Sequence, residues 1–257
     1  MNEAPDAALA FSRDEKLAIA ACALAMLIVQ MDWFALNLAL PAIARHFGVP
    51  ATDLQWVVSG YMLSIGALMV TAGRLADVYG RRRIIVIGLA AFGVVSALCG
   101  MATHELWLIA WRVVHGAGAV LIFPVAIAIV SGTFSGARQA RAIGVVLGVS
   151  AIGQALGPFV GGTVAEYASW RGVYFVNIPF CAAAIWLMLR YAQESRDDQA
   201  DRHIDVRGML TVTGGPRLHQ PRVRPRAGAA LAVAGALGLI AFGRRGAAGP
   251  SPRPAPR

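Results

Sequence analysis

The sequence predicts an all-α polytopic membrane protein, and three observations support that prediction. Hydrophobic residues make up 57% of the 257 residues and charged residues only 14%, whereas soluble domains carry about 25% charged residues. Runs of about 20 apolar residues recur along the chain, and a helix of that length crosses a bilayer. The alternating segments of about 10 residues that a transmembrane barrel would need are not visible.

Six apolar runs predict six transmembrane helices, at 17–40, 54–72, 84–102, 106–130, 142–165 and 172–189. Residues 1–16 form a polar leader before the first run. A cleaved signal peptide is the alternative interpretation of this run. Its apolar part would be only about 7–15 residues long, whereas Leu17–Leu40 is longer and contains Asp32. We therefore expect an uncleaved first helix.

The connections between these runs alternate in charge. Twelve Lys and Arg residues lie in one set, and only Arg45 and Arg171 lie in the other. The set rich in Lys and Arg comprises 1–16, 73–83, 131–141 and 190–208. The set poor in Lys and Arg comprises 41–53, 103–105 and 166–171. Cytoplasmic loops carry the excess of Lys and Arg. The pattern predicts a multi-pass protein of the cytoplasmic membrane with a cytoplasmic N-terminus.

The C-terminal part of the sequence changes character in steps. Residues 190–208 read as a charged cytoplasmic connector and 209–215 as the start of a seventh helix. Residues 216–257 form a tail rich in Arg, Pro, Gly and Ala, with an apolar island at 227–242. The change at residue 216 is typical of a reading-frame shift in a GC-rich gene, and sequencing the locus tests that hypothesis.

The net charge of +9 belongs to this tail. The first 215 residues hold 15 of the 23 Lys and Arg residues and all 14 Asp and Glu residues. The basic balance therefore indicates no nucleic-acid partner for the folded part.

Metal, disulfide and enzymatic chemistry find no support in the sequence. Cys22, Cys99 and Cys181 all lie inside apolar runs, where buried packing is the expected role. The sequence contains no His/Cys cluster, phosphate-binding loop or nucleophile elbow. We expect neither a metal site nor an enzyme.

Two ionisable residues lie deep in apolar helices. Asp32 and Arg112 each sit eight or nine residues from the outer end of their helix, which places both at a depth of roughly 12 Å. Ionisable groups at such depth commonly mark ion or substrate pathways. The alternatives are a structural ion pair or side chains that reach to the interface. The matched depth allows the two residues to pair, and the carboxylate could couple proton flow to a conformational change.

A short charged link joins the second and third runs. Gly73 and Gly80 allow tight turning there, and Asp77 with Arg81 and Arg82 could lock the cytoplasmic helix ends together. The plainer interpretation of the arginines is a topology signal, which leaves Asp77 unexplained.

A faint internal repeat accompanies this link. Gly73–Asp77 is similar to Gly162–Glu166, and Arg82 and Arg171 follow at the same separation. Three helices form an odd number, so the repeat predicts two inverted three-helix units, as in one large transporter fold.

The fifth run carries glycines four residues apart. Gly153, Gly157 and Gly161 form consecutive GxxxG repeats, with Pro158 and Gly162 beside them. Gly144 and Gly148 form another repeat. Small residues at this spacing make a groove for the close approach of a second helix, and Pro158 permits a kink.

Assembled in order, these residues resemble the major facilitator superfamily, and within it the drug:proton antiporters with fourteen helices. The resemblance covers about residues 17–215. It rests on Gly73–Arg83, on Leu108–Gly118 with Arg112, on Gly153–Gly162, on Asp32 with Asn37 and Pro41, and on Trp170–Arg171 with Asn177 and Pro179. It implies the N-terminal six-helix half of such a transporter.

The resemblance also implies a function. It implies export of amphipathic, often cationic, small molecules across the lipid bilayer by alternating access, driven by inward proton flow without another cofactor. Asp32, Asn37 and Arg112 would serve the proton and substrate pathway. Asp77 and Arg81 would gate the cytoplasmic side, and the fifth helix would bend.

The sequence departs from the family pattern in three respects. His115 stands where Gln is usual, and Phe34 stands where Thr is usual. The chain supplies one six-helix bundle, whereas such transporters use two, so a C-terminal half would be a missing partner. The alternative function is a truncated, transport-inactive fragment. Proton-driven dye efflux from vesicles, with Asp32→Asn as control, separates the two.

Overall fold

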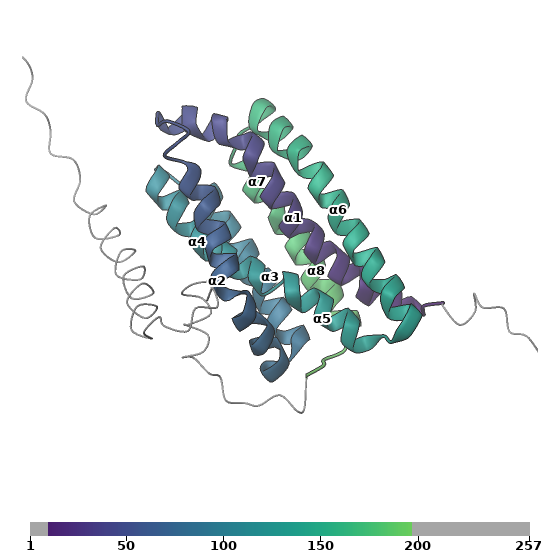
Figure 1. Cartoon of the computed structure of the whole chain (residues 1–257). Coiled ribbons are helices and arrows are strands. Elements are labelled where there is room, and N and C mark those ends of the chain that lie inside the picture. The colour runs from purple at the N-terminus through teal and green to yellow at the C-terminus, as the bar shows by residue number, and fades with distance from the viewer. Residues whose placement is uncertain (1–9, 197–257) are drawn as a thin grey trace, which may run out of the picture. The chain divides into compact units, whose positions relative to one another are not determined.

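A computed structural model describes residues 10–196, in which every regular element is a helix (Figure 1). Six helical segments in this range are long and apolar enough to cross a membrane. They are α1 (Arg13–Phe47), α2 (Gln55–Tyr79), α3 (Arg81–Gly100), α4 with α5 (Glu105–Val120 and Phe123–Thr133), α6 (Gly136–Tyr167), and α7 with α8 (Gly172–Phe175 and Asn177–Tyr191). The predicted six-helix membrane bundle is confirmed. The expected seventh helix at 209–215 and the tail at 216–257 lie outside the described residues.

The first helix is longer than its apolar run at both ends. Ser12 caps it by accepting a hydrogen bond from the Glu15 N–H, while the Glu15 carboxylate accepts one from the Ser12 N–H. This reciprocal arrangement is a capping box. The helix passes through Pro41 and ends at Gly48, whose φ of +67° suits a left-handed cap. The helix extends beyond the predicted span of 17–40 because apolar composition marks the membrane core, not the end of helical backbone.

The predicted continuous helices at 106–130 and 172–189 are each broken, and a proline explains each break. Pro124 and Pro179 have no N–H to donate to the carbonyl four residues earlier, so the helical ladder is interrupted near Leu121–Ile122 and at Val176. Each interrupted pair still forms one span, Glu105–Thr133 or Gly172–Tyr191.

The expected charged link at 73–83 is almost entirely helical. Helix α2 continues to Tyr79 and α3 begins at Arg81, so Gly80 alone makes the turn. Its φ of +103° lies in the region that favours glycine. Glycine is therefore needed at Gly80, whereas Gly73 lies inside α2.

Helices α1 and α6 lie side by side along most of their length (Figure 1), and glycines of α6 permit the contact. A Cβ added at Gly153 would lie 2.5 Å from the Leu27 carbonyl oxygen, and one at Gly157 would lie 2.6 Å from Phe34 Cβ. One at Gly161 would overlap the Ala35 carbonyl group. The predicted glycine groove is thus filled by α1.

The neighbouring small residues of α6 behave differently. A Cβ at Gly162 would make an ordinary 3.7 Å contact with Leu38, and one at Gly144 or Gly148 would meet nothing within 4 Å. Pro158 lies inside α6, which continues to Tyr167. Among the glycines of α6, only Gly153, Gly157 and Gly161 therefore form a close-packing surface against α1.

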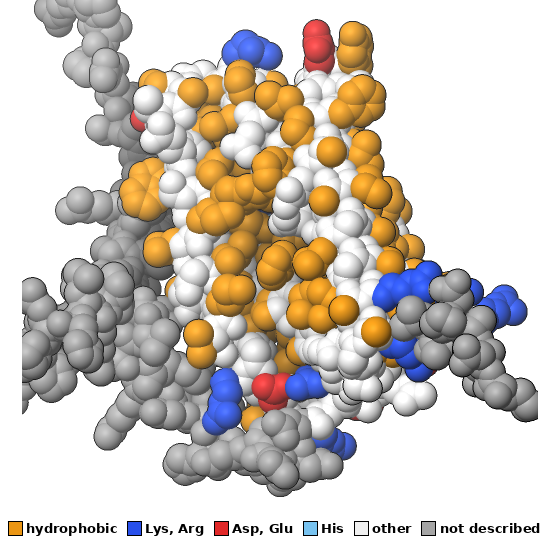
Figure 2. All heavy atoms as spheres, turned by 45° about the vertical axis from the view of Figure 1, so that its right-hand side comes forward, with side chains coloured by type: hydrophobic (Ala, Val, Ile, Leu, Met, Phe, Trp, Pro, Cys, Tyr) orange, Lys and Arg blue, Asp and Glu red, His pale blue; other side chains and the backbone are white. Residues whose placement is uncertain are grey.

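Charged side chains gather at the two ends of the bundle, with an apolar band between them (Figure 2). At one end Arg138 pairs with Glu15 at 2.7 Å, which joins the starts of α6 and α1. At the same end Arg82 donates to the Leu189 carbonyl, which joins α3 to α8. The Asp32 region lies far from both ends, so its charges belong to the bundle interior.

Candidate functional site

An ion pair lies in the interior of the bundle. Arg112 Nη1 of α4 donates to Asp32 Oδ2 of α1 at 2.7 Å, and neither side chain has any solvent exposure. The sequence placed these residues at matched depths, and the structure brings them into direct contact. Because desolvated charges are costly unless paired and hydrogen-bonded, the pair needs the further partners around it.

Asn177 and Ser96 complete one side of the pair. Asn177 Nδ2 of α8 donates to Asp32 Oδ1 at 2.9 Å and lies 3.0 Å from Ser96 Oγ of α3. Ser96 in turn donates to the Tyr174 carbonyl at 2.8 Å. Sequence reasoning noted Asn177 only through the family resemblance and missed Ser96. The one signal was a polar side chain in the middle of an apolar helix.

His115 lies on the other side of the ion pair. Its Nδ1 is 2.9 Å from Arg112 Nη1, and its ring stacks on Phe92 with centroids 3.9 Å apart. A guanidinium only donates, so His115 Nδ1 must accept. The imidazole is then neutral, with its proton on Nε2, and the 3.8 Å approach of Nδ1 to Asp32 is not an ion pair.

The Arg112 guanidinium is only partly satisfied by hydrogen bonds. Its Nε donates to the Val57 carbonyl at 3.4 Å, and its Cζ lies 4.2 Å from the centroid of the Tyr61 ring. Its Nη2 has no hydrogen-bond partner within residues 10–196. A cation over an aromatic face is stabilised electrostatically, most strongly when desolvated. Tyr61 therefore supplies part of what the missing hydrogen bond would.

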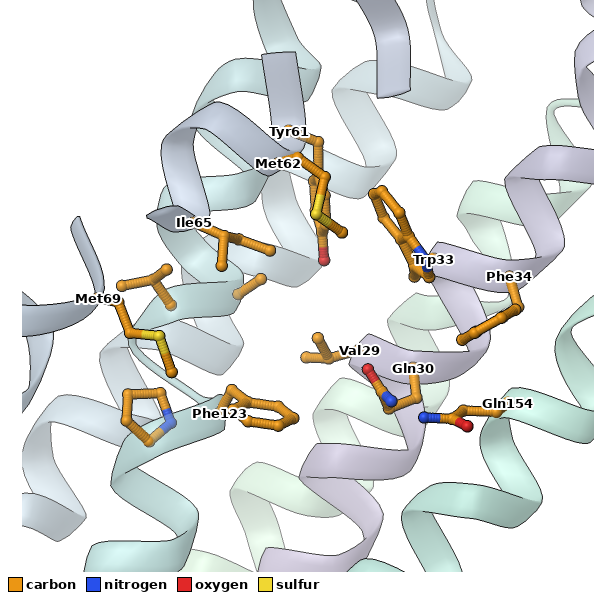
Figure 3. A pocket seen from close by; sticks show the side chains of 13 residues that line it. Val29, Gln30, Trp33, Phe34, Tyr61, Met62, Ile65, Met69, Phe123 and Gln154 are labelled. Atoms are coloured by element: carbon orange, nitrogen blue, oxygen red, sulfur yellow. The ribbon is translucent and has the colours of Figure 1, made fainter. Parts of the chain in front are cut away.

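An apolar pocket of about 300 Å³ lies beside this cluster, between α1, α2, α4, α5 and α6 (Figure 3). Its aromatic lining is Trp33, Phe34, Tyr61 and Phe123, and its polar lining is Gln30 and Gln154. The two glutamine side chains point toward each other from α1 and α6 (Figure 3). None of the lining side chains is Asp, Glu, His, Lys or Arg.

Asn37 does not join the buried cluster. Its amide donates to the Trp33 carbonyl one turn earlier, at 3.0 Å, and its side chain is exposed. Residues 30, 33 and 37 fall on one face of a helix. Asn37 therefore continues the pocket-facing side of α1 and does not contact Asp32 or Arg112 in the described structure.

The turn at Gly80 between α2 and α3, here called the Gly80 junction, forms a second charged site. It lies at the cationic end of the bundle, where Arg82 and Arg138 also lie. Arg81 pairs with Asp77 at 2.9 Å and donates to the Ala128 carbonyl at 3.2 Å. The Glu194 carboxylate accepts the backbone N–H groups of Arg82 and Arg83 at 3.0 and 3.2 Å. An acid at that position complements the positive end of α3. Sequence reasoning assigned Glu194 only to a solvated connector.

The buried cluster offers one ionisable carboxylate in a polar setting. No group of three or more His, Cys, Asp and Glu residues in the described range could hold a metal ion. The cluster instead holds one buried carboxylate with a fixed countercharge and two amide or imidazole neighbours. Such a carboxylate can exist in two protonation states, and each state requires different partners.

Comparison with known proteins agrees with this architecture. The chain matches the model of the Major Facilitator Superfamily over residues 22–244. It is 36% identical over 200 residues to the multidrug resistance protein Stp of Mycobacterium tuberculosis, covering 77% of this chain and 37% of Stp. It is 35% identical over 231 residues to the cephamycin export protein CmcT of Amycolatopsis lactamdurans, covering 87% and 47%. The chain thus spans less than half the length of these curated relatives.

The crystal structure of the human organic anion transporter MFSD10 (TETRAN) shares the fold. It superposes with a TM-score of 0.59 at 14% identity, covering 79% of this chain and 54% of that one. That level of identity indicates the fold alone. The family model covers most of the sequence, and relatives exceed 30% identity over most of it. The chain therefore belongs to the Major Facilitator Superfamily of membrane transporters.

Proposed function

We propose that this chain forms the ligand-binding and proton-binding part of an exporter, one that moves amphipathic small molecules out of the cytoplasm in exchange for protons. One observation supports this most directly. Asp32 and Trp33 are consecutive residues of α1, and the first holds the buried ion pair while the second lines the pocket. Proton site and ligand site therefore share one stretch of backbone.

Protonation of Asp32 would change the energetics of the whole cluster. The neutral acid would leave the Arg112 charge buried without its counterion, which costs several kcal/mol in typical buried pairs, about 3–5. The protonated and ionised forms would therefore favour different arrangements of α1 and α4. A proton gradient can drive alternating access through such a pair of states, without ATP or another cofactor.

The pocket suits an amphipathic aromatic ligand. Its volume of about 300 Å³ is at the lower end of the range for small-molecule sites. Trp33, Phe34 and Phe123 offer ring faces, which also attract organic cations, and the two glutamines offer hydrogen bonds. Relatives named for multidrug resistance and for cephamycin export support this substrate class.

The charged end of the bundle bears on the orientation in the membrane and on a cytoplasmic gate. The cationic end of the bundle, with Arg81, Arg82 and Arg138, would face the cytoplasm. The protein would then lie in the cytoplasmic membrane with a cytoplasmic N-terminus. The Asp77–Arg81 pair and the Glu194 contact would hold that end closed against a C-terminal half supplied by the remainder of a full-length transporter. Asn37 would extend the substrate path.

Gradient-driven transport in proteoliposomes tests the proposal. Vesicles acidified inside should accumulate ethidium when they contain the wild-type chain together with the C-terminal half that completes the transporter, because protons leaving the vesicle would exchange for the dye. Asp32→Asn should abolish the accumulation. Asp14→Asn is the matched control, because Asp14 lies on the same helix but is exposed. Accumulation by Asp32→Asn equal to that of the wild type would contradict the proton role.

A second candidate function is a membrane element that binds ligand and protons but does not transport them. The chain matches only 37% to 47% of its relatives' length, and transporters of this build place the site between two bundles. Ethidium binding without gradient-driven accumulation would favour this second function.

A further inference from the structure

We propose that Tyr61 is a positioning residue that transmits ligand binding in the pocket to the proton on Asp32. The inference rests on the proposed function and assigns its coupling step to one side chain. Tyr61 has three properties that bear on it. Its backbone is fixed against α4, its ring supports Arg112, and its hydroxyl is buried without a partner.

The backbone of Tyr61 is held close to the charge cluster. A Cβ added at Gly116 of α4 would lie 2.5 Å from the Tyr61 carbonyl oxygen, so only glycine admits this approach. One turn further along α2, Ser64 Oγ donates to the Val113 carbonyl at 2.7 Å. Movement of α2 at Tyr61 is thus constrained, and the ring is the part that can respond to a ligand.

The Tyr61 ring contacts both the ion pair and the pocket wall. The Arg112 Cζ atom lies 4.2 Å from its centroid, and the Trp33 ring stacks on it at 5.5 Å with an interplanar angle of 25°. Trp33 lines the pocket. A flat ligand that displaces Trp33 or tilts Tyr61 therefore changes the surface on which the guanidinium rests.

The hydroxyl of Tyr61 has an unmet hydrogen bond. The side chain is wholly buried, and its Oη has no partner in residues 10–196. Figure 3 shows the hydroxyl end of the ring directed toward the pocket. A buried hydroxyl without a partner is costly. A ligand with a hydrogen-bonding group would remove that cost and hold the ring in one orientation.

Tyr61 is distinguished from every other group around the carboxylate. The titratable and charged groups that face Asp32 are Tyr61 of α2, Cys99 of α3, Arg112 and His115 of α4, Tyr174 of α7 and Cys181 of α8. Helix α5 has no titratable side chain, and those of α6 lie near its ends. In this described set, Tyr61 alone also lines the pocket.

The direction of coupling follows from the state that the structure shows. The Asp32–Arg112 contact at 2.7 Å, which favours the ionised carboxylate, coexists with the pocket and with a guanidinium that rests on the Tyr61 ring. A ligand that fixes Tyr61 under Arg112 stabilises the ionised pair. Binding should therefore release a proton from molecules in which Asp32 is protonated, and affinity should rise as pH rises.

Counting protons released on ethidium binding tests the assignment, with the detergent-solubilised chain in weakly buffered acidic solution. The wild type should release protons, and Asp32→Asn should release none. Tyr61→Phe keeps the ring, so it should still release protons while binding ethidium roughly threefold to tenfold more weakly. Tyr61→Leu should still bind, but with proton release largely lost. Tyr79→Leu, on the exposed end of the same helix, should match the wild type.

Each contrary outcome has a distinct meaning. Wild-type release retained in Tyr61→Leu would overturn the role of Tyr61 while leaving proton coupling intact. Ethidium binding without proton release in the wild type would contradict the proposed function and the inference together. If Tyr61→Leu does not fold, Tyr61→Met is measured in its place, since methionine adapts to irregular gaps and also removes the ring.

Discussion

Arg112 Nη1 lies 2.7 Å from Asp32 Oδ2, and both side chains are completely removed from solvent. The contact joins α4 to α1 across residues 80 positions apart. Each charge is the main reason that the other can be buried. Removing one of the two charges should therefore lower the free energy of unfolding strongly when the other charge is still present.

Breaking the pair from one side should be much more costly than breaking it from both. Arg112→Met should lower the free energy of unfolding by about 3–5 kcal/mol, because Asp32 is left as an uncompensated buried charge. The double variant Asp32→Asn/Arg112→Met should cost clearly less than the sum of the single variants. Unfolding in mixed micelles titrated with sodium dodecyl sulfate measures all three. Additive losses would contradict a directly coupled pair.

The Asp77–Arg81 pair provides the matched comparison. Its side chains are 31% and 19% exposed, and exposed pairs contribute about 0–1 kcal/mol. The same double-variant cycle at these residues should give a coupling no larger than that.

Glycine substitutions in α6 should separate packed positions from open ones. Gly161→Ala should destabilise the bundle by about 1–3 kcal/mol, because the new methyl group overlaps the Ala35 carbonyl and forces α1 away. Gly148→Ala meets nothing within 4 Å and should be neutral, or should stabilise by up to about 1 kcal/mol through helix propensity. Thermal unfolding of both variants measures the contrast. Equal effects would mean that α6 does not pack on α1 through this series.

Removing the acid that caps α3 should loosen the Gly80 junction. Glu194→Gln weakens the bonds from the Arg82 and Arg83 N–H groups and removes the charge at the positive helix end. Amide hydrogen exchange at these two residues should accelerate roughly fivefold. Glu166→Gln, at the far end of α6, should leave that exchange unchanged. Unaltered exchange in Glu194→Gln would show that the contact contributes nothing to the junction.

The residue at position 115 should be replaceable by any side chain that can accept from Arg112. His115→Gln keeps an acceptor oxygen and should retain wild-type stability within about 1 kcal/mol. His115→Leu leaves an Arg112 donor without its 2.9 Å partner and should cost about 1–3 kcal/mol more. Chemical unfolding of the two variants decides the point. Equal losses would indicate that ring packing on Phe92, not hydrogen bonding, is the role of His115.

The helices were predictable because membrane crossing imposes a simple length and composition rule. Their ends were not, because a capping box at Ser12 and a left-handed Gly48 act on the backbone outside the apolar run. The break near Leu121 was also missed. Pro124 was visible in the sequence, but the apolar run continues through it. The hydrophobic pattern alone does not indicate that the missing proline N–H breaks the helix there.

The candidate site was predictable in its charges and not in its neutral members. Asp32 and Arg112 stood out because ionisable residues are rare in apolar helices. Ser96 and Tyr61 did not, because such residues occur in membrane helices for many reasons and only tertiary contact assigns them a role. Asn37 was expected in the proton and substrate pathway, and it lies on the pocket-facing side of α1 with its amide donating to the Trp33 carbonyl, not beside Asp32. Helical phase, which separates residue 32 from residue 37, determines that difference.

Infrared difference spectroscopy on ligand binding tests the central claim most directly, because it detects the protonation state of a single carboxyl group. At acidic pH, ethidium added to the wild type should remove the carbonyl-stretch band of a protonated carboxyl group. In Asp32→Asn no such band should be lost. A wild-type spectrum without that change, or the same loss in Asp32→Asn, would contradict the claim that the buried Asp32 exchanges its proton for a ligand.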